Sequence, residues 1–164
     1  MHPLKTLTTG LLVAVSLATA HAADTPPSPW SLDINVTSVH TEAWARRQLN
    51  QDNPGLGIEV KFSPDWNAAG GFYKNSYRRE TAYLLGIWTP LHWHWGLPCG
   101  LTASAGLAAG LVSGYRRTEV PTAPLAAGAV LRLRTAQGFG INLLAVPNTQ
   151  SGSGFIGLQL VAPL

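Results

Sequence analysis

Apolar and polar residues alternate along most of the chain after about residue 30. Ile58, Val60 and Phe62, for example, are separated by polar residues, as are Leu131 and Leu133. A period of two is typical of β-strands with one buried face, and turn residues bound each run. We expect eight strands, roughly at 31–40, 55–63, 66–75, 78–89, 100–112, 124–135, 138–146 and 154–161.

The connections between these segments alternate between long and short. Long polar stretches lie at 41–54, 113–123 and 147–153, whereas Pro64 and Asp65 alone join the second and third segments. An even number of strands with this alternation is typical of an outer-membrane protein. The pattern therefore predicts an all-β, eight-stranded antiparallel up-and-down transmembrane β-barrel. A soluble, lipocalin-like barrel is the alternative.

The first residues have the pattern of an export signal. Lys5 precedes an apolar stretch at 11–18, and small residues at 20–23 suit a signal peptidase. The apolar stretch is too short for the alternative, a membrane anchor. We predict a signal peptide at 1–23 and an outer-membrane β-barrel domain at 24–164, in a Gram-negative bacterium. Cys99 is the only cysteine, so no internal disulfide is expected.

Composition narrows the class further. Charged residues make up 12% of the chain, about half the usual share, while 17 glycines accompany a near-neutral mean hydropathy. These values exclude a disordered chain and a bundle of membrane helices. The aromatic residues suggest two interfacial belts. Tryptophans fall near the short connections (Trp30, Trp66, Trp88, Trp93, Trp95), and tyrosines near the long ones (Tyr73, Tyr77, Tyr115).

Three connections at the long-loop end each carry an arginine doublet. The doublets are Arg46-Arg47, Arg78-Arg79 and Arg116-Arg117. The planar guanidinium group suits phosphate, and the lipid A part of lipopolysaccharide carries phosphates at the outer leaflet. We predict that these arginines bind lipid A. The alternative is a solvated rim without a specific ligand.

Prolines and small residues suggest a route for a lipid. Pro54, Pro124 and Pro147 lie at outer strand ends, where a missing amide donor would leave gaps in the ladder and allow lateral access for an acyl chain. Prolines that simply end strands are the alternative. The segments 66–75, 78–89 and 100–112 are small and apolar on both faces, which predicts an apolar interior.

No cofactor or metal site is expected. His92 and His94 share one face of a strand, but no third ligand lies near them in the sequence, so interfacial polar side chains are the better interpretation.

The order and spacing of several short motifs resemble the outer-membrane lipid A palmitoyltransferase (PagP) family across most of the mature chain. The motifs read SVH at 38–40, NQDNPGLG at 50–57 and KNSY at 74–77, followed by later strands with similar proline placement. The resemblance implies transfer of an acyl chain from an outer-leaflet phospholipid to lipid A, with His40 and Ser76 at the site. Asn75 stands at the family's acid position, and the acyl-chain floor would fall at Gly86 or Ile87.

The chemistry leaves several roles open. Histidine commonly manages the proton of an attacking hydroxyl. Ser76 could act as nucleophile, proton partner or oxyanion donor, and Asn75 could orient His40 or donate to an oxyanion. The alternatives are a non-catalytic barrel of this fold that binds lipid or lipopolysaccharide, and a small adhesin or porin-like barrel. We expect a membrane-embedded monomer whose partners are phospholipid and lipopolysaccharide, without nucleic acid.

Overall fold

A computed structural model describes residues 28–149 and 152–164, and the signal peptide predicted at 1–23 lies outside them. The described residues form a closed barrel of eight antiparallel strands, which confirms the predicted all-β class, the number of strands and their up-and-down order. The strands are β1 (Trp30–His40), β2 (Asp52–Lys61), β3 (Trp66–Lys74), β4 (Glu80–His94), β5 (Thr102–Val112), β6 (Leu125–Arg134), β7 (Gly140–Val146) and β8 (Phe155–Pro163).

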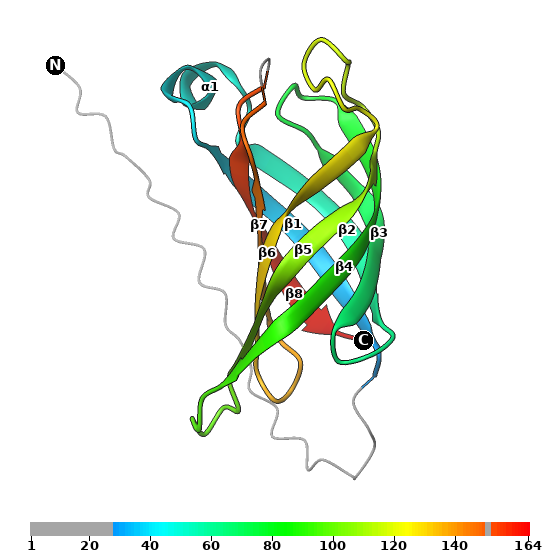
Figure 1. Ribbon diagram of the computed structural model, residues 1–164, viewed down its shortest axis with the longest axis vertical. Helices are drawn as coiled ribbons and strands as arrows, with labels where there is room; N and C mark the ends of the chain where they lie inside the picture. Colours follow the sequence, from blue (N-terminus) through cyan, green and yellow to red (C-terminus); the bar gives the residue numbers. More distant parts are fainter. Residues whose placement is uncertain (1–27, 150–151) are drawn as a thin grey trace, which may run out of the picture.

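Each strand pairs with its neighbours in the chain, and β1 closes the barrel against β8, with Ser31 opposite Pro163 and His40 opposite Phe155. The long connections gather at one end, together with the short helix α1 (Ala43–Gln48), and the short turns lie at the other end (Figure 1). We call these the α1 end and the short-turn end. Closure gives every strand a hydrogen-bonded neighbour on both sides along most of its length.

Most strand ends lie within about two residues of the prediction, and three features differ more clearly. Helix α1 interrupts the loop at 41–51, where the sequence analysis placed only polar coil. Pro54 lies inside β2 rather than before it, beside an irregularity in the pairing of β1 with β2. Strand β4 continues to His94, through a second irregularity between Trp88 and Leu91 that accommodates Pro90. A proline without an amide hydrogen is tolerated in a sheet where the ladder shifts.

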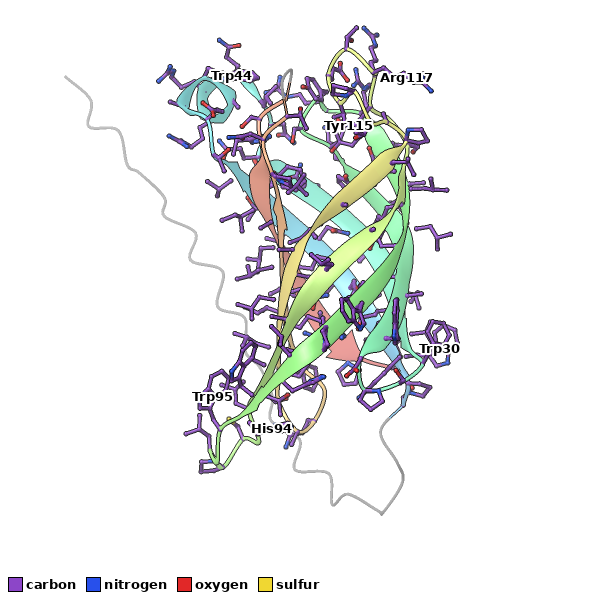
Figure 2. All side chains as sticks on the ribbon, viewed as in Figure 1. Trp30, Trp44, His94, Trp95, Tyr115 and Arg117 are labelled. Atoms are coloured by element: carbon purple, nitrogen blue, oxygen red, sulfur yellow. The ribbon has the colours of Figure 1, made fainter. Side chains whose placement is uncertain are left out.

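Large apolar side chains cover the outside of the barrel between its two ends. Exposed examples occur on every strand except β7, and include Ile34, Leu56, Phe72, Leu84, Leu107, Leu125 and Ile156. Trp30 and Trp95 lie at the short-turn end, as predicted, whereas Trp44 lies at the α1 end (Figure 2). Such a continuous exposed apolar surface is unusual for a protein surrounded by water.

Among the described residues, no helix is long and apolar enough to cross a membrane.

The interior has two halves of different character. Toward the short-turn end, the buried Glu59 carboxylate pairs with Arg132 and accepts a 2.9 Å hydrogen bond from Asn67. Asn142 also donates to Glu59, at 3.4 Å, and hydrogen bonds to Gln159. The prediction of an apolar interior is wrong for this half, because the polar residues that alternate along β2, β6 and β7 point inward. Toward the α1 end the interior is mainly apolar.

Candidate functional site

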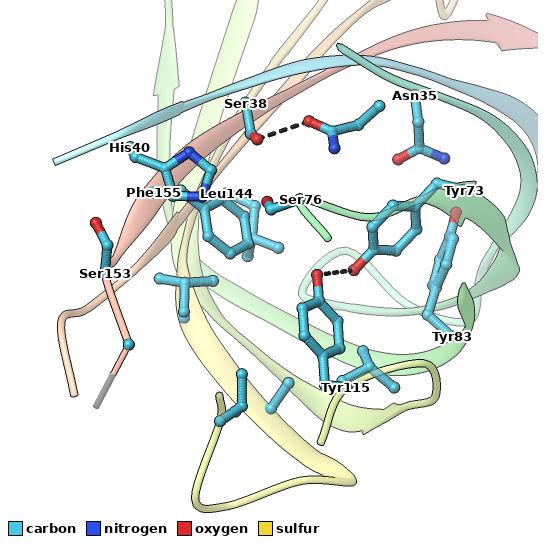
Figure 3. A pocket seen from close by; sticks show the side chains of 18 of the residues that line it. Asn35, Ser38, His40, Tyr73, Ser76, Tyr83, Tyr115, Leu144, Ser153 and Phe155 are labelled. Atoms are coloured by element: carbon cyan, nitrogen blue, oxygen red, sulfur yellow. Dashed lines mark hydrogen bonds between the residues drawn. The ribbon is translucent and has the colours of Figure 1, made fainter. Parts of the chain in front are cut away.

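A cavity of about 150 Å³ occupies the barrel interior at the α1 end. Most of its wall is apolar, with Leu85, Val112, Leu144 and Phe155 contributing from four different strands. His40, Ser76, Tyr73 and Tyr115 add polar groups near its mouth (Figure 3). A cavity with an apolar wall and a few converging polar groups is the usual form of a small-molecule site.

His40 reaches the cavity from the last position of β1. Its side chain is 2% exposed, and its imidazole packs against the Phe155 ring with a centroid separation of 6.0 Å. The Nδ1 atom is buried and has no hydrogen-bond partner among the described residues. Arg46 fixes the backbone here by donating hydrogen bonds to the carbonyl oxygens of His40 and Thr41. The ring is thus held in place while one nitrogen remains unpaired.

Ser76 faces the same cavity from the loop between β3 and β4, and Figure 3 shows its side chain and the His40 ring turned into this space. Its side chain is buried, and its carbonyl oxygen accepts a hydrogen bond from the Asn50 amide at 2.9 Å. Two residues far apart in sequence therefore line one cavity, because β1 and β3 both end at the α1 end of the barrel. The structure shows no hydrogen bond between these two described side chains.

Asn75, the third residue of the predicted catalytic site, does not face the cavity as His40 and Ser76 do. Its side chain is completely buried and does not line the cavity. The Oδ1 atom accepts hydrogen bonds from the amides of Tyr77 and Arg79, at 2.9 and 3.1 Å. The Nδ2 group donates to Thr81 Oγ1 and to the Gly114 carbonyl oxygen, at 3.0 and 3.1 Å. All the hydrogen-bonding capacity of the amide faces the loops rather than His40.

The connection between β5 and β6 covers part of the cavity mouth. Tyr115 in this connection lies 3.1 Å from Tyr73, hydroxyl to hydroxyl, and packs edge-on against Tyr77. Burial raises the pKa of Tyr115, so its hydroxyl stays neutral. Tyr73, Tyr77 and Tyr115 all line the cavity, so the prediction that they form an outer aromatic belt is wrong. The sequence pattern predicted the end of the barrel at which these tyrosines lie. The direction in which their rings point depends on the fold.

The six predicted phosphate-binding arginines divide into two groups. Arg46 and Arg79 bind other parts of the protein. Arg46 donates hydrogen bonds to the carbonyl oxygens at the end of β1. Arg79 forms an ion pair with Glu119 and donates a 2.7 Å hydrogen bond to the Gly114 carbonyl oxygen. Burial alone would favour the neutral Glu119, but hydrogen bonds from Arg79 and the Arg116 amide outweigh it and lower the pKa of Glu119. The others are exposed at the α1 end: Arg47, Arg78, Arg116 and Arg117.

The barrel wall is incomplete beside the cavity. Strand β6 begins at Leu125, but its pairing with β7 begins only at Ala129, opposite Ala145. Pro124 directly precedes β6 and Pro147 directly follows β7, so both predicted prolines flank this gap. A recess on the outer surface at this place shares several lining residues with the inner cavity, namely Ala108, Ala127, Gly128, Val146 and Pro147.

The two residues proposed for the acyl-chain floor point in opposite directions. Gly86 faces outward and is exposed, whereas Ile87 is 4% exposed and belongs to the buried apolar cluster below the cavity. Tyr83 closes the cavity above this cluster. Its ring crosses the interior toward β2, where a Cβ on Gly57 would lie 2.1 Å from the Tyr83 hydroxyl oxygen. Gly57 therefore makes the space for Tyr83, a contact that the sequence pattern did not indicate.

Within the described part of the chain, no group of three His, Cys, Asp or Glu side chains could hold a metal ion. His92 instead pairs with Asp65 at the short-turn end, with 2.8 Å between Nε2 and Oδ1.

The sequence matches no protein-family model and no curated protein.

Proposed function

We propose that this protein is an outer-membrane acyltransferase of the PagP type, which moves an acyl chain from an outer-leaflet phospholipid to lipid A. The observation that carries the proposal is the position of His40 and Ser76. Both side chains are buried at the mouth of an apolar cavity, and the cavity adjoins a gap in the barrel wall. An acyl chain that lies in the cavity would bring its ester carbonyl to these two side chains.

The exposed apolar surface supports a membrane setting. Its side chains would contact lipid, and the closed sheet would satisfy the backbone hydrogen bonds that a bilayer cannot. The α1 end then faces the outside of the cell. Arg47, Arg78, Arg116 and Arg117 would lie at the depth of the lipid A phosphates, each as an exposed cation.

The reaction would be an ester exchange. A lipid A hydroxyl attacks the acyl carbonyl carbon, a new C–O bond forms, and the bond to the phospholipid glycerol oxygen breaks. His40 would accept the proton of the attacking hydroxyl and return it to the departing glycerol oxygen, so that protons balance. Ser76 would assist by donating a hydrogen bond to the carbonyl oxygen. In a two-step form, Ser76 Oγ would instead take the acyl group while its proton passes through His40 to the departing glycerol oxygen, and the lipid A hydroxyl would then displace Ser76, whose proton is returned by His40. Water excluded from the apolar cavity would not compete for the acyl group.

The cavity also suggests a limit on the acyl chain. Tyr83 and the buried cluster that includes Ile87 close its lower end, and the polar half of the interior begins beyond them. An extended chain would therefore stop at Tyr83.

The test is expression in cells that lack other lipid A acyltransferases, followed by mass spectrometry of lipid A. The wild type should add the mass of one acyl group. His40→Ala and Ser76→Ala should each reduce the modified fraction by about 100-fold or more, the usual size of a lost acid–base group. Ser104→Ala is the matched control, because Ser104 lies on β5 and does not line the cavity.

The second candidate is a barrel of the same fold that binds lipid or lipopolysaccharide without acting on it. The unpaired His40 Nδ1 and the full use of the Asn75 side chain by the loops are the observations that favour it. Unmodified lipid A from cells with correctly folded wild-type protein would contradict the enzyme and leave this candidate.

A further inference from the structure

Asn75 is placed between two loops in a way that only an amide side chain satisfies. Backbone N–H groups of Tyr77 and Arg79 point at one side of the group, so that side must be the carbonyl oxygen. The Gly114 carbonyl oxygen lies 3.1 Å from the other side, so that side must be the NH₂ donor. The surrounding groups therefore fix the orientation of the Asn75 amide. They also require an acceptor and a donor in one planar group, which an amide provides.

A carboxylate in this position would lose the hydrogen bond to the Gly114 carbonyl oxygen. An ionised aspartate has only acceptors, so one oxygen would face the Gly114 carbonyl oxygen without a hydrogen between them. The side chain is also completely buried, which makes an unpaired charge more costly. These contacts explain structurally why an asparagine, and not an aspartate, suits this position.

Gly114 is the point where the two loops are joined. Its carbonyl oxygen accepts hydrogen bonds from both Asn75 Nδ2 and Arg79 Nε, at 3.1 and 2.7 Å. Gly114 has a φ of +78°, and a Cβ there would lie 2.6 Å from the Glu80 carbonyl oxygen. The backbone therefore approaches the β3–β4 loop as closely as a glycine allows.

The residue after Gly114 is Tyr115, which covers the cavity mouth. Three contacts hold the segment 113–124 in this closed position: the hydroxyl pair with Tyr73, the edge-on packing on Tyr77, and the ion pair between Arg79 and Glu119. We call the segment 113–124 the lid. Each of these three contacts reaches back to β3 or to the β3–β4 loop, and Ser113 also exchanges hydrogen bonds with Ala82 of β4.

We propose that Asn75 is a positioning residue that ties the lid to the β3–β4 loop, so that Tyr115 closes the cavity beside Ser76. The same amide that shapes the loop carrying Ser76 therefore also sets the position of the lid. The inference deepens the proposed function by giving Asn75 a role outside the reacting groups. Lid closure can be measured without acyl transfer, so its test is independent of that function.

The test is limited digestion with trypsin of the folded protein in detergent micelles, with cleavage sites mapped by mass spectrometry. Arg116 and Arg117 are exposed cleavage sites within the lid, and Arg46 and Arg47 on α1 provide an internal reference on the same molecule. Asn75→Asp should speed cleavage in the lid by about tenfold, since a hydrogen bond is lost and a repulsion gained. Cleavage at the α1 sites should remain within about twofold of wild type.

Two further variants make the result decisive. Gln137→Glu adds the same charge at an exposed position of the β6–β7 turn, away from the lid and α1, and should leave lid cleavage unchanged. Arg79→Met removes the other donor to the Gly114 carbonyl oxygen and should also speed lid cleavage, even if Asn75→Asp fails to fold. Unchanged lid cleavage in the Asn75 and Arg79 variants would overturn the proposal. An increase confined to the sites at Arg78 and Arg79 would do the same, because Asn75 would then shape only its own turn.

Discussion

Glu59 carries a charge into the barrel interior because polar partners surround its carboxylate. Arg132 forms the ion pair, Arg134 lies 3.8 Å away, and the amides of Asn67 and Asn142 donate hydrogen bonds. Removing one member of a buried pair leaves its partner without compensation, which is costlier than losing the pair as a whole. This network fills the half of the interior that the cavity does not.

Glu59→Gln should therefore lower the free energy of unfolding by about 3 kcal/mol, because the Arg132 guanidinium would stay buried without its counter-charge. Urea unfolding in detergent micelles, followed by tryptophan fluorescence, measures the change. Asp65→Asn is the matched control: its ion pair with His92 is largely exposed and should contribute less than about 1 kcal/mol. Equal effects of the two substitutions would contradict a special role for the buried pair.

At the scale of the elements, the unpaired start of β6 is the feature with the clearest functional consequence. Residues 125–128 pair with β5 but not with β7, and small side chains line the wall on both sides of this gap. If the barrel lies in a membrane as proposed, an acyl chain would pass from lipid to the cavity here without unfolding a strand. We expect lateral access at this gap, between Pro124 and Pro147.

Ala127→Phe should close this route, since Ala127 lines both the outer recess and the inner cavity. We expect acyl transfer to lipid A to fall by about tenfold or more, which corresponds to about 1.4 kcal/mol of added barrier. Leu84→Phe adds an aromatic ring to the exposed outer face of β4, away from the gap, and should change transfer by no more than about twofold. A fully active Ala127→Phe protein would argue against lateral access.

At the scale of the whole molecule, the apolar outer surface and the tryptophans define how the barrel would sit in a bilayer. Trp30, Trp66 and Trp88 are all exposed near the short-turn end, and Trp66 stacks on Trp88 with centroids 6.1 Å apart. Indole rings favour the boundary between headgroups and acyl chains. These three residues should mark the inner interface of the proposed membrane protein.

Phospholipids with bromine atoms at defined depths can test this placement by quenching tryptophan fluorescence in liposomes. A protein that keeps Trp66 as its only tryptophan should be quenched more by shallow labels than by labels at the bilayer centre. A protein that keeps only Trp44, which lies on α1 beyond the opposite end of the strands, should be quenched little by central labels. Absence of quenching in both proteins would contradict membrane insertion.

The sequence by itself determined the number, order and pairing of the strands, because a period of two and regular turns are local properties. It also placed His40 and Ser76 at one end of the barrel, because β1 and β3 run in the same direction in an up-and-down barrel and therefore end on the same side. Local pattern could not show that Glu59 and Arg132 meet inside, that Tyr115 folds over the cavity, or that Asn75 turns from His40 toward Gly114. Those contacts join residues far apart in the chain, and only the closed barrel, with its register and curvature, decided them.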